Sequence, residues 1–170
     1  MKLAAAILLL AFARPLHAQS PSAPHTVFDR ILHPFGASKK PPRYNDPRLR
    51  GLLLEIQVPV EPVRLSEVRQ LHVKAILSNI GAAPVSIDFP TAQRIDIHLL
   101  NANDEILTRW SENRAFAEEI GNLLINPREQ IIYDETIATR ELQSGRVYTV
   151  EVFFPRYPEL RARQKFMTAP

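Results

Sequence analysis

Between Gly51 and Phe154, apolar and polar residues alternate in short segments that are separated by turn residues. The most regular of these segments span residues 71–77, 85–89, 95–99 and 147–154. Successive side chains of a β-strand point to opposite faces, so a period of two is typical of a strand with one buried and one solvated face. No long stretch has the 3.6-residue period of a helix, and we therefore expect no parallel sheet with crossover helices.

Further segments with strand character lie at residues 52–58, 106–110 and 130–137, and residues 112–119 are a short helical candidate. Asparagine, aspartate, serine and glycine separate the segments, for example at residues 101–104 and at Ser144-Gly145. Many short strands with regular turn signals are typical of a sandwich. The sequence therefore predicts an all-β fold, an immunoglobulin-like antiparallel β-sandwich of seven or more strands.

The N-terminus has the pattern of a secretory signal. Lys2 precedes the apolar run Leu3–Ala13, and Ala18 offers a cleavage position. This run is shorter than the roughly 20 apolar residues that a membrane helix needs. We predict that residues 1–18 are a signal peptide and that the protein is exported, to the periplasm or the extracellular space. An uncleaved N-terminal anchor is the alternative, and no other segment has the length and apolarity to span a membrane.

Proline content divides the rest of the chain. Residues 19–49 hold six prolines and little periodicity, which predicts an extended linker or arm. Residues 50–155 are the predicted sandwich domain. Residues 156–170 are basic and show no clear period, which predicts a C-terminal tail.

Composition excludes several functional classes. The chain has no cysteine, so disulfides, thiol catalysis and cysteine-bound zinc are excluded. Once Lys2 and Arg14 leave with the signal, 19 basic residues face 18 acidic ones. That balance does not favour nucleic-acid binding. The oligomeric state is open.

No recognisable catalytic or metal-binding motif is present. Asp96 and His98 share one strand face, but a catalytic dyad would also need a nucleophile. His72 and His98 are expected on wet faces, as single surface histidines. The acidic and amide residues between Asn101 and Glu105 lack calcium-loop spacing and are expected to form a hairpin turn. We therefore predict a protein that is not an enzyme, with no catalytic, cofactor-binding or metal-binding residues.

Short motifs follow one another in order between Leu77 and Phe153. They are Ser78-Asn79 with Pro84-Val85 and Ile87-Asp88-Phe89; Gln93-Arg94-Ile95-Asp96-Ile97; Leu107-Thr108-Arg109-Trp110-Ser111 with Phe116; and Leu124 with Pro127, Glu129, Gly145 and Tyr148. This arrangement resembles the BsuPI domain, the family of a bacillar intracellular proteinase inhibitor. Departures from the family pattern occur at Ala92, Ile95, Thr108 and Arg128, where glycine, an aromatic residue, tryptophan and glycine are usual.

The resemblance implies a protein-binding module that inhibits or binds serine proteases, such as a subtilisin-like enzyme, with no cofactor. The alternative is an exported structural or adaptor domain without inhibitory activity. The loops expected to meet a partner are Asp88–Gln93 and Ser111–Phe116. The family-motif residues are Gln93, Asp96, Arg109, Trp110, Ser111, Phe116, Glu129 and Tyr148.

Structural roles are expected for several of these residues. Trp110 is predicted to lie buried between the sheets, with Phe116 filling the end of the core. Asp96 and Arg109 lie on strands expected to pair, which predicts a cross-strand ion pair with Gln93 nearby. Tyr148 is expected to form a hydroxyl bond across a turn, as in a tyrosine corner.

Overall fold

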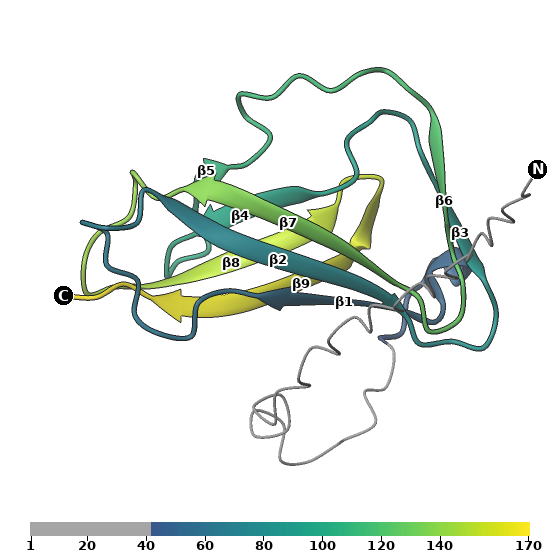
Figure 1. Ribbon diagram of the computed structural model, residues 1–170, viewed down its shortest axis with the longest axis horizontal. Helices are drawn as coiled ribbons and strands as arrows, with labels where there is room; N and C mark the ends of the chain where they lie inside the picture. Colours follow the sequence, from purple (N-terminus) through teal and green to yellow (C-terminus); the bar gives the residue numbers. More distant parts are fainter. Residues whose placement is uncertain (1–41) are drawn as a thin grey trace, which may run out of the picture. The chain divides into compact units, whose positions relative to one another are not determined.

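The computed structural model describes residues 42–170, and Figure 1 shows it as a β-sandwich. The predicted signal peptide and most of the predicted arm lie outside the described residues. The elements are η2 (Pro47–Leu49), β1 (Leu52–Gln57), β2 (Gln70–Asn79), β3 (Val85–Phe89), β4 (Asp96–Leu100), β5 (Ile106–Arg109), β6 (Gly121–Ile125), β7 (Gln130–Ala138), β8 (Val147–Phe154) and β9 (Tyr157–Met167). Within this part of the chain, no helix is both long and apolar enough to cross a membrane.

The strands form three antiparallel sheets, with the orders β1-β2-β7, β3-β6 and β5-β4-β8-β9. In Figure 1 the three-stranded sheet lies across the four-stranded sheet, and β3 and β6 form a separate ribbon. The prediction of an all-β antiparallel sandwich with at least seven strands is confirmed, since the described residues contain nine strands.

The core forms from the apolar positions of the alternating segments. Strand β2 contributes Leu71, Val73 and Leu77, and β8 faces it with Val150 and Val152, all fully buried. The ring of Phe154 packs against those of Phe89 and Tyr133. Each buried side chain of this size stabilises the fold by about 1.5–3 kcal/mol. In a chain without cysteine, this packing is the main source of stability.

The prediction that residues 156–170 form a C-terminal tail outside the sandwich is wrong. Residues Tyr157–Met167 form β9, which pairs with β8 from Arg161 to Met167 and again at Tyr157. Leu160 and Phe166 are buried, while Ala162 and Gln164 occupy the inward positions between them. Those two side chains are small or polar, and for that reason the period of two was not visible in the sequence. The domain therefore extends past Pro155 to the end of the chain.

Two further segments differ from the sequence analysis. Residues 121–125, which had no assigned strand, form β6 and pair with β3. Residues 112–119, the short helical candidate, form a turn followed by irregular backbone. This segment carries the chain from β5, in the four-stranded sheet, to β6, in the β3-β6 ribbon (Figure 1).

Asn79 joins the turns at one end of the sandwich. Its side-chain amide donates to the carbonyls of Ala83 and Ile125 at 2.9 Å, and its Oδ1 accepts the Gly81 N–H at 2.9 Å. Its backbone N–H donates to Glu129 and its carbonyl accepts from Arg128. Arg128 has a φ of 68°, a conformation in which glycine is less strained.

Candidate functional site

Asp96 controls the path of the chain after β5. Its Oδ2 accepts the Ser111 hydroxyl at 2.6 Å, and its Oδ1 accepts the backbone N–H groups of Ser111 at 3.2 Å and of Ile97 at 2.8 Å. Only 7% of the residue is exposed. Hydrogen bonds to a charged acceptor are stronger than neutral ones. The Asp96 carboxylate therefore fixes the start of the segment that leads to β6.

Asp96 does not pair with Arg109 as the sequence predicted. In the β4–β5 register Arg109 lies opposite His98, and the Trp110 N–H donates to the Ile97 carbonyl at 2.8 Å. The register shifts between Leu99 and Leu100, which alternation alone does not reveal. Gln93 is also not a partner of Asp96, because its side-chain amide donates to the Ile95 carbonyl at 3.3 Å.

His98 shares the face of Asp96, as the period of two predicts, but its side chain is mostly covered instead of solvated. The reason is that β4 is an inner strand, with β5 and β8 on either side. Its Nε2 lies 3.8 Å from Asp96 Oδ2 and its Nδ1 lies 3.9 Å from Glu151 Oε2. Burial has the largest effect on the pKa of His98 and lowers it. The carboxylates of Asp96 and Glu151 act in the opposite direction and raise it, while the charge of Arg109 lowers it further.

The acidic residue Glu151 is satisfied by cations of β9. Arg163 Nε donates to Glu151 Oε1 at 2.8 Å, and Arg161 lies 3.7 Å away. The hydrogen bond to Glu151 raises the pKa of Arg163. The Ser111 hydroxyl donates to Asp96 and not to His98, so these residues lack the serine–histidine contact on which nucleophilic catalysis depends. The cluster is a structural network on the outer face of the four-stranded sheet.

Trp110 lies at the margin of the core instead of between the sheets. Its Nε1–H donates to Glu135 Oε2 on β7 at 3.2 Å, and the Arg114 guanidinium lies over its ring at 3.9 Å. Phe116 packs on the same indole, with the ring centres 5.8 Å apart, and does not fill the end of the core. Strands β5 and β7 are edge strands of different sheets, so the indole bridges the open side between them.

The structure brings the two predicted partner loops together. We call residues 110–120 the crossing segment. The Ala92 N–H of the β3–β4 loop donates to the Ala117 carbonyl of the crossing segment at 2.8 Å. Arg94, in the same loop, lies 4.4 Å over the Phe89 ring. Figure 1 shows both segments running from the four-stranded sheet towards β3 and β6.

The other family-motif residues hold turns. The Tyr148 hydroxyl accepts the Gln143 N–H at 2.7 Å and donates to the Gln143 carbonyl at 3.4 Å, so the predicted bond across the turn is confirmed. Glu129 Oε2 accepts both the backbone N–H and the side-chain amide of Asn126, at 2.7 Å and 3.0 Å. Tyr148 and Glu129 therefore have structural roles, because each holds a turn of the fold.

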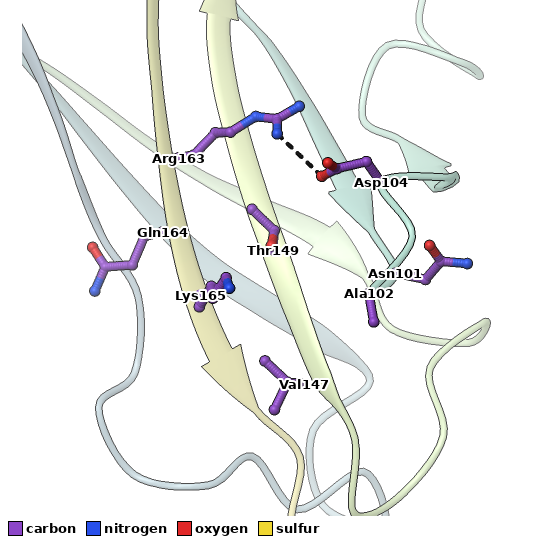
Figure 2. Close-up of a pocket in the computed structure, with 8 residues that line it drawn as sticks. All are labelled: Asn101, Ala102, Asp104, Val147, Thr149, Arg163, Gln164 and Lys165. Carbon is purple, nitrogen blue, oxygen red and sulfur yellow. Dashed lines mark hydrogen bonds and ion pairs between the residues drawn. The ribbon is translucent and has the colours of Figure 1, made fainter.

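Figure 2 shows a hollow between the β4–β5 turn and strands β8 and β9. It is lined by Asn101, Ala102, Asp104, Val147, Thr149, Arg163, Gln164 and Lys165. Arg163 points across the hollow to Asp104, with 3.1 Å between Nη1 and Oδ1. Since Arg163 also binds Glu151, its charge is already matched by two carboxylates of the protein.

The β1–β2 loop was not singled out from the sequence. Its residues 59–62 are exposed, and Val60 reaches 85% exposure, while Val58 and Val63 on either side are buried. Val63 pairs with the C-terminal segment: its N–H donates to Met167 at 2.9 Å, and its carbonyl accepts from Ala169 at 2.8 Å. A valine between Pro59 and Pro62 is the sequence signal that marks this loop.

Residues 42–170 contain no group of three or more histidine, aspartate or glutamate side chains arranged to hold a metal ion. A family model described as intracellular proteinase inhibitor, BsuPI, matches residues 60–158, which is more than half of the chain. No curated protein sequence matches the chain.

The chain has only a distant similarity to the solved structures that it matches. A mutant β-glucosidase from Listeria innocua in complex with laminaribiose has 14% identity and a TM-score of 0.42, over 70% of this chain and 16% of that chain. A β-glucuronidase from Bacteroides uniformis has 12% identity and a TM-score of 0.34, over 66% of this chain and 12% of that chain. This chain therefore spans less than a fifth of the length of either glycosidase chain.

Proposed function

The chain belongs to the BsuPI family of intracellular proteinase inhibitors, and from that premise we propose that it is a non-catalytic binding module that occupies the active-site cleft of a serine protease. The observation that carries the proposal is the family match over residues 60–158, which contain strands β2 to β8. The family match supports a protease as the partner. That this protease belongs to the serine class is part of what we propose.

The way the loops are held supports this function. A loop that binds a protease cleft must keep its shape, because ordering a flexible loop on binding reduces affinity. The crossing segment is fixed by the Asp96–Ser111 bonds, and the β1–β2 loop by the pairing of Val63. A rigid sandwich with restrained loops is thus suited to bury about 800 Å² against a partner protein.

The proposed setting is outside the cytoplasm, in the periplasm or the extracellular space. It is supported by the charged start and apolar run of residues 1–18. The absence of cysteine means that no thiol would be oxidised there. In this respect the proposal departs from the family description, which names an intracellular inhibitor.

A titration tests the function. Increasing amounts of the protein are added to fixed amounts of subtilisin, elastase, chymotrypsin and trypsin, and residual activity on a chromogenic peptide is measured. We expect a stoichiometric loss of activity for at least one enzyme, with the protein intact by mass spectrometry. Full activity with progressive digestion of the chain would contradict the proposal. Full activity with an intact chain would favour the structural or adaptor alternative.

A further inference from the structure

Among the large apolar residues that the described part of the chain exposes, Val60 and Ile120 are the most exposed, each at 85%. They differ in how the flanking chain is held. Ile120 follows two exposed glutamates, Glu118 and Glu119, and directly precedes β6. Val60 lies in the middle of four exposed residues that are bounded on both sides by buried valines.

The backbone of the β1–β2 loop is restrained at both ends. On one side, Val58 is buried directly after β1. On the other side, Val63 forms a parallel bridge with Thr168, and its two backbone hydrogen bonds join it to Met167 and Ala169. The last residues of the chain therefore brace this loop, at the end of the sandwich where Figure 1 shows the C-terminus.

Between these buried ends, proline limits the conformations of the tip. Pro59 and Pro62 each fix one φ angle, so the four-residue tip has little backbone freedom to lose when it binds. The Val60 side chain points to solvent although its burial would be favourable. A restrained, protruding backbone with one free aliphatic side chain has the form of a peptide presented to a protease cleft.

We propose that the β1–β2 loop is the protease-binding loop and that Val60 enters the S1 pocket of a serine protease that prefers small aliphatic side chains. This inference rests on the proposed function and adds its site and specificity. The size of the S1 pocket sets which side chain a serine protease accepts at this position, and elastase has a small pocket of this kind. Valine fills such a pocket, whereas it leaves the deeper pockets of trypsin and chymotrypsin largely empty.

The test measures inhibition constants of the full chain and three variants against elastase, chymotrypsin and trypsin. Val60→Asp places a charge in an apolar pocket, and we expect inhibition of elastase to weaken about 100-fold or more. Val60→Phe is expected to shift the preference towards chymotrypsin. Ile120→Asp is the matched control, since Ile120 has the same exposure as Val60. It should inhibit elastase as the unchanged chain does.

The outcomes separate the inference from the function on which it rests. Because Val60 is exposed, all variants should keep the circular dichroism spectrum and melting temperature of the unchanged chain. If the unchanged chain inhibits elastase and Val60→Asp inhibits it equally well, the loop assignment is overturned while the proposed function stands. If inhibition is lost in Ile120→Asp instead, the contact lies near the crossing segment and the assignment is again overturned. If the unchanged chain inhibits no serine protease, both the proposed function and the assignment fail.

Discussion

The crossing segment and the β1–β2 loop are both exposed, but they are held in opposite ways. The crossing segment is fixed by side chains along its length: Arg114 and Phe116 both contact Trp110, and Ser111 binds Asp96. The β1–β2 loop is fixed by backbone hydrogen bonds and by prolines, and Val60 stays free at its tip. Side chains that stabilise the fold are not available to a partner, so the comparison favours the β1–β2 loop for binding.

The largest expected effect concerns the residue that fixes the crossing segment. Asp96→Ala removes the acceptor of three hydrogen bonds and one of the two carboxylates beside the partly buried His98. We expect a loss of about 3 kcal/mol in the free energy of unfolding, measured by urea denaturation. Amide exchange in residues 111–117 should speed up, while Val63 keeps its protection.

Ser111→Ala is the matched control for that variant, because it removes only the hydroxyl bond to Asp96. Its expected cost is about 1 kcal/mol. Equal exchange rates in both loops of Asp96→Ala would contradict the view that they are held independently.

A second, smaller effect tests whether Trp110 belongs to the margin of the core. Trp110→Ala removes a half-buried indole together with its contacts to Arg114 and Phe116. We expect a loss of about 2 kcal/mol, which is less than the 3–5 kcal/mol typical of a fully buried aromatic residue. Arg114→Ala should cost less than about 1 kcal/mol, because its cation–π contact is exposed. A loss near 5 kcal/mol for Trp110→Ala would place the indole in the core after all.

The fold was predictable from sequence where inward positions are large and apolar. Strands β2, β3 and β8 follow the expected alternation, since Val73, Ile87 and Val152 are unmistakably apolar. Strand β9 was missed because Ala162 and Gln164 occupy inward positions that carry little apolar signal. Alternation reports which face a residue takes, and it reports that well only when the buried side chains are large.

The site was less predictable, because it depends on register and on loops. Asp96 and Arg109 were expected to pair, but in the observed β4–β5 register Arg109 lies opposite His98. Trp110 was expected inside the sandwich, and nothing in the sequence shows that β5 is a short edge strand. A bond of the Tyr148 hydroxyl across a turn was predicted correctly, since it is local; the partner, Gln143, was not predicted. The brace of Val63 by the C-terminus joins distant parts of the chain, and local patterns do not report it.

A third effect is a pH dependence of stability that originates at His98, which lies beside Asp96, the residue that fixes the crossing segment. Burial lowers the pKa of His98 in the folded protein, while an unfolded histidine titrates near 6.5. Between these values the unfolded chain binds more protons, so stability falls as pH drops from above 6.5 through the folded pKa. Asp96, Glu151 and Arg109 face the imidazole and contribute to this balance.

Melting temperatures between pH 8 and pH 5 measure this dependence, and His98→Gln should flatten the slope relative to the unchanged chain. His72→Gln is the matched control, because His72 is an exposed histidine on β2. An identical slope in His98→Gln would show that other groups cause the loss of stability.

The smallest expected effect on stability concerns the prolines of the β1–β2 loop. Pro62→Ala leaves the contacts of the folded loop in place but gives the unfolded chain more conformations, so the free energy of unfolding should fall by only about 0.5 kcal/mol. Binding responds differently, because the tip must then lose more backbone freedom in a protease cleft. We expect the inhibition constant to rise several-fold while the melting temperature hardly changes.

Pro155→Ala, in the β8–β9 turn, is the matched control and should show the small loss of stability without the loss of inhibition. Parallel effects of the two substitutions on inhibition would mean that the β1–β2 loop is no more important for binding than a distant turn.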